Sequence, residues 1–118
     1  MTFDNFRNFC LSFRGVTEET PFDERTLVYK VMGKMFALTD LHDFNAVNLK
    51  CDPDKALDLR ERYEAVTAGY HMNKKHWNTV AIGGDAPDSE LYDWIRHSYD
   101  LVYASLPKKL KEELAAME

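Results

Sequence analysis

The strongest constraint on the fold is a set of three consecutive β-type runs, at residues 26–31, 35–41 and 46–51. Within them apolar and polar side chains alternate, which is typical of strands with one buried face. A short turn containing Gly33 joins the first two runs as a hairpin, and Asp43 and Asn45 supply turn conformations before the third. The runs therefore predict an antiparallel meander.

The segments around the meander add helices and two further strands. Apolar spacing of three and four residues predicts helices over residues 2–13, 53–63, 87–106 and 108–117. Asp52 and Pro53 suit the N-cap and first position of the second helix, whose charged residues, Arg60 among them, are expected to face water. Shorter β-rich runs occupy residues 66–70 and 77–82. Residues 16–25 are rich in acids and contain Pro21, so we expect a surface loop there.

The predicted order of elements is α-β-β-β-α-β-β-α-α. It contains no βαβ repeat, and 118 residues with 45% apolar composition suffice for one core. We therefore expect a single α+β domain over residues 1–118, with helices packed on a mostly antiparallel five-stranded sheet.

The overall charge argues mildly against nucleic acid and anionic membranes. The chain has 20 acidic and 15 basic residues, for a net charge of −5, so such a partner would need a segregated basic face. No apolar run reaches the length of a membrane span, and the first residues lead into an amphipathic helix and not a signal peptide. We expect a cytoplasmic protein that does not enter membranes, and we favour a monomer.

One stretch reverses the acidic balance. Residues 65–84 contain no acid, and within them lie the candidate nucleic-acid-binding residues Asn73, Lys74, Lys75, His76, Trp77 and Asn78. Ammonium groups suit phosphates, amides suit base edges, and an indole can stack on a base. In the alternative, Tyr70 and Trp77 fill the core, the asparagines satisfy turn backbone, and the lysines protect a strand edge from aggregation.

No pattern for catalysis, a metal or a cofactor is found in the sequence. Glycine-rich phosphate loops, nucleophile elbows and zinc-ligand pairs are absent, and His71 and His76 lack a nearby third ligand. We therefore predict no catalytic residue, no metal and no cofactor. The open alternative is a small-ligand or enzymatic site made by His71, Asn73, His76 and Trp77.

The two cysteines and a second basic cluster lie outside this stretch. Cys10 and Cys51 stand alone in apolar segments, so we expect reduced, mostly buried thiols, with a disulfide or a reactive thiol as the alternative. A second basic cluster comprises Lys108, Lys109 and Lys111. Sequence reasoning leaves open whether this cluster joins the Lys74 and Lys75 surface.

Four blocks resemble the MmcQ/YjbR family of small bacterial proteins, as does the Pro21-Phe22 pair. The blocks are residues 34–38, 48–53, 69–80 and 97–102, and the third, which contains Tyr-His-Met-Asn-Lys-Lys-His-Trp-Asn, is the most specific. The resemblance covers nearly the whole chain. It implies an α+β fold similar to the CyaY and secretion-chaperone type, and a DNA-binding role through a double-wing motif.

Two hypotheses from different classes follow. In the first, the chain is a non-catalytic DNA-binding module that contacts phosphates through β-hairpin wings and the Lys74-Lys75 loop. In the second, it is a protein-interaction or chaperone-like module that presents its sheet or a groove to a polypeptide.

Overall fold

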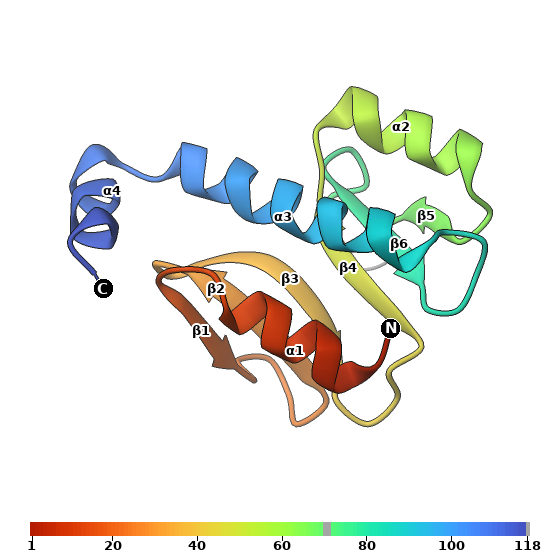
Figure 1. Cartoon of the computed structure of the whole chain (residues 1–118), viewed down its shortest axis with the longest axis horizontal. Coiled ribbons are helices and arrows are strands. Elements are labelled where there is room, and N and C mark those ends of the chain that lie inside the picture. The colour runs from red at the N-terminus through yellow and green to blue at the C-terminus, as the bar shows by residue number, and fades with distance from the viewer. Residues whose placement is uncertain (70–71, 118) are drawn as a thin grey trace.

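The predicted meander forms the middle of a six-stranded sheet in the computed structural model, which describes residues 1–69 and 72–117 (Figure 1). The strands lie in the order β1-β2-β3-β4-β6-β5, and every neighbouring pair is antiparallel. Their bounds are β1 Val16–Glu19, β2 Thr26–Val31, β3 Lys34–Asp40, β4 Ala46–Lys50, β5 Val66–Ala68 and β6 Trp77–Ala81.

The prediction of five strands was wrong, because β1 forms within the segment that was expected to be a loop. β1 pairs with β2 from Val16 opposite Val31 to Glu19 opposite Val28. Glu18 points toward the helices, where it accepts hydrogen bonds from Arg7 at 2.8 Å and from the Tyr29 hydroxyl at 2.9 Å. An acidic residue is therefore stable on the inner face of a strand, and the observed order is α-β-β-β-β-α-β-β-α-α.

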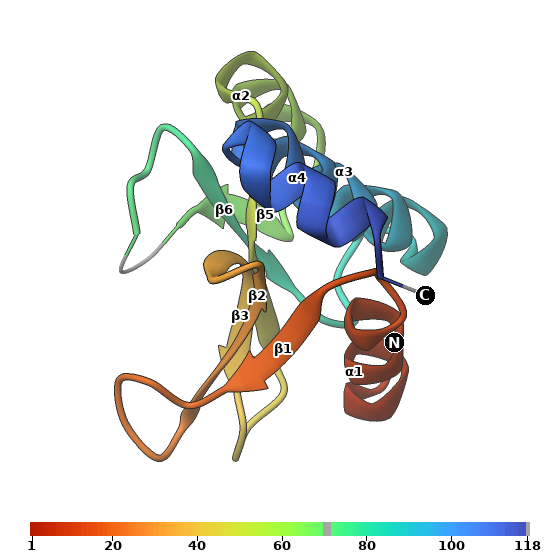
Figure 2. The ribbon, with the colours of Figure 1, turned by 90° about the vertical axis from the view of Figure 1, so that its left-hand side faces the viewer.

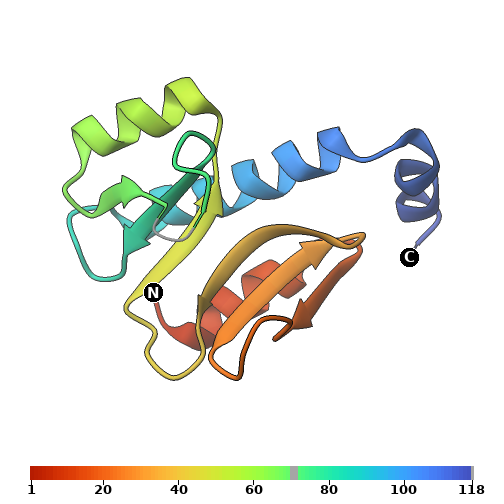
Figure 3. The same ribbon diagram turned by 180° about the vertical axis from the view of Figure 1, so that it is seen from behind.

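The four helices lie on one side of the sheet, as Figure 2 shows. They are α1 Phe3–Leu11, α2 Pro53–Arg62, α3 Asp88–Ser105 and α4 Lys108–Ala115. Residues 20–25, between β1 and β2, and residues 72–76, before β6, protrude on the opposite side, where none of the described helices covers the sheet (Figures 2 and 3). Among the residues that the structure describes, no helix has the length and apolar character needed to cross a membrane.

The core lies between the helices and the sheet. α3 is the longest helix and buries six residues against β2, β3 and β4: Leu91, Trp94, Ile95, Ser98, Tyr99 and Val102. α1 adds Phe6, whose ring meets the Tyr29 ring edge to face at 5.6 Å between centroids. Together they form a single α+β core.

Ser98 is one of the polar residues buried in this core, and it joins α3 to two strands. Its side chain is fully buried. The hydroxyl donates to the Phe36 carbonyl at 2.5 Å and accepts from the Lys50 amide at 2.9 Å. The paired register of β3 and β4 ends at Ala37 opposite Leu49, so Ser98 satisfies backbone groups that lie just beyond the ladder.

We predict that Ser98→Ala lowers the free energy of unfolding by about 1–3 kcal/mol, since it leaves a buried carbonyl and a buried amide without this partner. Ser105→Ala, near the end of the same helix, is the matched control, because the Ser105 hydroxyl bonds only locally to the Val102 carbonyl. Urea unfolding measures both variants. Equal effects of the two substitutions would contradict the bridging role of Ser98.

Candidate functional site

The turn before β6 is closed by Asn73. Its carbonyl accepts from the amides of His76 at 3.1 Å and Trp77 at 3.0 Å, and its side-chain oxygen accepts from the Lys75 amide at 2.9 Å. These bonds leave Lys74 and Lys75 exposed at the tip. The Asn73 amide thus serves the turn backbone, as asparagine side chains commonly do.

Arg60 of α2 ties this turn to the helix. Its Nε donates to the Asn78 side-chain oxygen at 2.7 Å, and a terminal guanidinium nitrogen donates to the carbonyls of Trp77, at 3.2 Å, and of Lys74. The expectation that Arg60 faces water was wrong. α2 packs beside β5, so its last turn reaches β6, and no periodicity in the sequence signals that contact.

Trp77 and Asn78 are interior residues, exposed by 7% and 2%. Asn78 lies on the helix side, where its amide nitrogen also donates to the Ala56 carbonyl at 3.4 Å. Trp77 is paired with Lys50 on the other face, and Gly69 permits its close approach, since a Cβ there would lie 2.7 Å from the Trp77 Cβ. Among the candidate residues, Asn73, Lys74 and Lys75 are exposed and His76 is half-buried. Tyr70 and His71 lie outside the described residues.

The end of β4 is where the blocks that carry the family resemblance meet. Three successive backbone amides, of Lys50, Cys51 and Asp52, donate to two other segments, α3 and the turn before β6. The acceptors are the Ser98 hydroxyl at 2.9 Å, the His76 carbonyl at 2.7 Å and His97 Nε2 at 3.2 Å. The blocks 48–53, 69–80 and 97–102 therefore form one structural junction.

The helix-free face carries an apolar groove of about 440 Å³. Register places Leu38 beside Val28 and Asn48 across this face, and Thr79 donates to the Asn48 side chain at 2.6 Å. The groove is lined by residues of the sheet and of both protruding segments: Phe22, Asp23, Thr26, Leu38, Thr39, Asp40, Asn48 and Met72. It thus combines an apolar floor with a polar rim.

The two acids of the groove are already partnered. Asp23 accepts from the backbone amides of Thr26 at 2.6 Å and Arg25 at 2.8 Å, and these bonds hold its pKa below the usual value. Asp40 accepts from the Arg25 guanidinium at 2.8 Å, which lowers the pKa of Asp40 in the same way. The groove lining contains two carboxylates and no lysine or arginine.

The second basic cluster does not join the turn. α4 lies at the opposite end of the molecule from α2 and β6 (Figures 1 and 3). Lys108 approaches Glu112 at 3.9 Å, and the Lys111 ammonium lies 5.8 Å from the centre of the Tyr103 ring.

Cys10 and Cys51 are both unpaired and buried as predicted, and burial raises the pKa of Cys51 to about 11.

The family model described as YjbR matches residues 11–101. The chain belongs to the YjbR family. The resemblance found in the sequence blocks is thereby confirmed, and the junction at the end of β4 is built from three of those blocks.

Similar proteins extend the match over the whole chain. The uncharacterised protein YjbR of Escherichia coli K12 is 30% identical over 118 residues, covering 99% of this chain and all of its own. The uncharacterised protein YbdF of Escherichia coli O157:H7 is 40% identical over 90 residues, or 75% of this chain and 74% of its own. The crystal structure of Deinococcus radiodurans DR2400 has a TM-score of 0.90 and 38% identity, and the match covers 97% of this chain and 88% of that one.

We predict that the stability of this YjbR-family chain depends on His97 as the pH falls. Burial lowers the pKa of His97 below its usual value near 6.5, with Lys55 adding to the effect. The unfolded chain then binds the proton more tightly, so the free energy of unfolding falls as the pH drops through about 6.5. His97→Gln should show a smaller fall in urea unfolding measured between about pH 8 and pH 5.5. An identical pH dependence of the free energy of unfolding in the wild type and in His97→Gln would contradict this prediction.

We predict that Arg60→Ala lowers the free energy of unfolding by about 1–3 kcal/mol, because it leaves the buried Asn78 oxygen without its charged donor. It should also speed amide exchange of His76 and Trp77. Arg62→Ala is the matched control, since its only described ion pair is an exposed one, to Asp58, worth less than about 1 kcal/mol. Equal effects of the two substitutions would remove Arg60 from this role.

Proposed function

We propose that this YjbR-family chain is a binding module that holds an extended polypeptide segment on the helix-free face of its sheet. The observation that carries the proposal is the groove of about 440 Å³ between the two protruding segments. A concave, mainly apolar site with a few polar groups on its rim is the usual form of a ligand site. Extended peptides are commonly bound in apolar surface grooves of this kind.

The floor of the groove supports an apolar anchor in the partner. Phe22 is 64% exposed, although it lies next to Leu38 and Met72 around one cavity. A single exposed ring is ordinary on a protein surface, but apolar side chains gathered around a groove are typical of binding sites. A large apolar side chain of the partner would cover Phe22 and fill the groove.

The charges beside the groove favour acidic residues next to that anchor. Lys74 and Lys75 are exposed, Lys50 lies two residues beyond Asn48 on the same face, and none of the three makes an ion pair within the described residues. The two acids that line the groove, Asp23 and Asp40, already accept hydrogen bonds from backbone amides and from the Arg25 guanidinium, respectively. The partner that best fits is a segment with an apolar residue followed by Asp or Glu.

DNA is the second candidate, and exposed Lys74 and Lys75 at the tip of a protruding turn favour it. The family resemblance implies contact through two wings. The other protruding segment, residues 20–25, carries Asp23 and Glu24 against only Arg25, which would repel phosphates. A DNA role would therefore rest on the turn of residues 73–76. The CyaY-like classification and the cytoplasmic location stay predictions.

We expect selection from a library of random peptides of about 12 residues to yield apolar-acidic sequences. Phe22→Ser should weaken binding of an enriched peptide at least about tenfold, the loss of a buried ring contact. Leu57→Ser, which changes a similarly exposed apolar residue on α2, should leave it unchanged. Isothermal titration calorimetry measures both. No enrichment, or equal effects of the two substitutions, would reject the polypeptide.

Titrations with DNA test the second candidate function separately from peptide binding. Labelled duplex and single strands of about 20 nucleotides are titrated at low and physiological salt, because phosphate contacts weaken steeply with salt. Salt-sensitive binding that Lys74→Glu with Lys75→Glu abolishes, and that Lys108→Glu with Lys109→Glu preserves, would establish DNA. No binding at low salt would remove it.

A further inference from the structure

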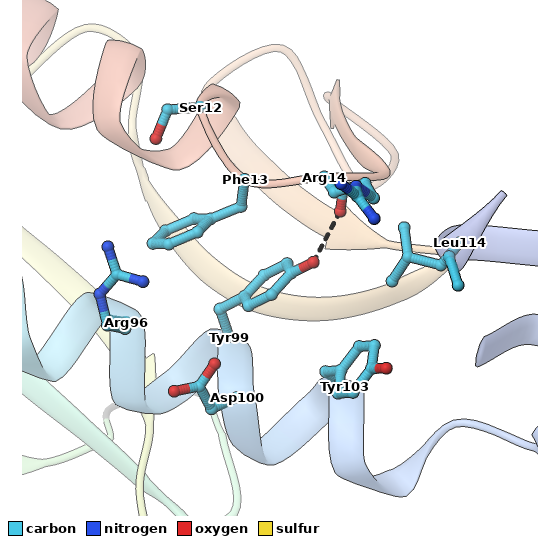
Figure 4. Close-up of a pocket in the computed structure, with 9 residues that line it drawn as sticks. Ser12, Phe13, Arg14, Arg96, Tyr99, Asp100, Tyr103 and Leu114 are labelled. Atoms are coloured by element: carbon cyan, nitrogen blue, oxygen red, sulfur yellow. Dashed lines mark hydrogen bonds between the residues drawn. The ribbon is translucent and has the colours of Figure 1, made fainter. Parts of the chain in front are cut away.

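A cavity of about 550 Å³ lies on the helix side of the protein, where the end of α1 approaches α3 and α4 (Figure 4). It shares no lining residue with the groove on the helix-free face. Arg14 and Arg96 lie on opposite sides of its stacked aromatic rings, so the two guanidiniums do not converge on one ligand (Figure 4). The groove is therefore the better place to look for a specific polar contact.

Most polar side chains of the groove already use their hydrogens in contacts within the protein. The Thr39 hydroxyl donates to the Ala46 carbonyl at 2.8 Å, and the Thr26 hydroxyl donates to the Asp23 carboxylate at 3.2 Å. Asp23 and Asp40 are themselves acceptors when ionised. An oxygen of a ligand therefore finds no uncommitted donor among these threonines and aspartates.

Asn48 is the exception in the groove lining. Its side-chain oxygen accepts from the Thr79 hydroxyl at 2.6 Å, whereas its amide nitrogen donates no hydrogen bond within the residues that the structure describes. None of their buried polar side-chain atoms lacks a partner, so this nitrogen is accessible to solvent. Asn48 lies opposite Leu38 on one side and Thr79 on the other. Because the oxygen is bonded to Thr79, the nitrogen is directed away from β6, on the side of the groove.

Lys50 adds positive charge close to this nitrogen. It lies two residues beyond Asn48 on the same face, roughly 7 Å along the strand. The flexible lysine side chain can span that distance, so its ammonium can approach a group bound at Asn48. The charge of Asp40 is offset by its ion pair with Arg25 at 2.8 Å. These charges favour a carboxylate over a neutral carbonyl as the group that Asn48 binds.

We propose that Asn48 is a specificity-determining residue of the groove, and that its amide nitrogen donates to the carboxylate of an Asp or Glu beside the partner's apolar anchor. The inference rests on the proposed binding of an extended polypeptide, and it assigns the atom that selects the acidic residue. Lys50 supplies attraction without a fixed direction. The Asn48 amide supplies direction, because Thr79 holds it in one orientation.

A double-mutant cycle measures this contact. An enriched peptide, and the same peptide with its acidic residue changed to Ala, are titrated by calorimetry against the wild type and Asn48→Ala. Each single change should weaken binding about tenfold or more, the loss of a hydrogen bond to a charged group. The double change should weaken binding little further, because the effects of groups in contact are not additive. Losses that multiply would overturn the role of Asn48 and leave peptide binding in place.

Asn48→Asp provides a second variant in case Asn48→Ala disturbs the sheet, since a carboxylate can still accept from Thr79. Asn48→Asp should weaken binding of the acidic peptide. It should bind the peptide with Lys at that position about tenfold more tightly than the wild type does, because it adds a charge-assisted hydrogen bond. An unchanged preference between the two peptides would contradict the contact.

Thr67→Asp is the matched control for the added charge. Thr67 is exposed, is paired with Thr79 on the same face, and lies outside the groove lining. Solvent and salt screen an exposed charge at that distance, so the preference should change by less than about twofold. An equal change in Thr67→Asp and Asn48→Asp would reject a specific contact.

The peptide selection separates this inference from the function on which it rests. Enriched peptides that are apolar but lack an acidic residue would overturn the carboxylate contact and leave the groove as a peptide site. A library that yields no binding peptide would reject the proposed function, and the role of Asn48 with it.

Discussion

The buried hydroxyl of Ser98 is the interaction on which the arrangement of this chain depends. A polar group in a core is stable only when it is hydrogen-bonded, and Ser98 meets that condition by accepting from β4 and donating to β3 just beyond their ladder. These two hydrogen bonds fix the position of α3 along the sheet. With α3 in that position, His97 reaches the Asp52 amide, which fixes the start of α2.

Arg60 makes the next set of contacts that fix the elements relative to one another. α2 leaves the end of β4 in a set direction, and its last turn carries a guanidinium that binds the turn before β6 and the buried amide of Asn78. The most specific block of the family resemblance is therefore largely a structural device. Its asparagines and backbone close a turn and join α2, β4 and β6, which explains why such a specific pattern says little directly about a ligand. Lys74 and Lys75 are its most accessible charges.

The cations of this acidic chain are distributed over separate surfaces on opposite sides of the sheet. Lys50 lies on the helix-free face and Lys74 and Lys75 at the exposed tip of the turn before β6, whereas Arg14 and Arg96 lie on the helix side, where the end of α1 approaches α3. A duplex across both protruding segments would meet acids on one of them, so a long polyanion fits poorly. A short peptide with its own acidic residues requires a basic surface of smaller extent than a duplex does.

The sequence by itself determined the family, the α+β class, the meander and the helices, because strand and helix periods are local properties of the chain. It also identified the loop that carries Lys74 and Lys75 and allowed for Trp77 as a core residue, whereas the burial of Asn78 was not foreseen. Only the tertiary structure decided that Val16–Glu19 is a strand, since Glu18 is stable there through Arg7 and Tyr29, which are distant in sequence. The same holds for Arg60, whose partners lie on β6, and for the cavity between α1, α3 and α4. Such sites are made by residues brought together across the fold, and no spacing along the chain records that proximity.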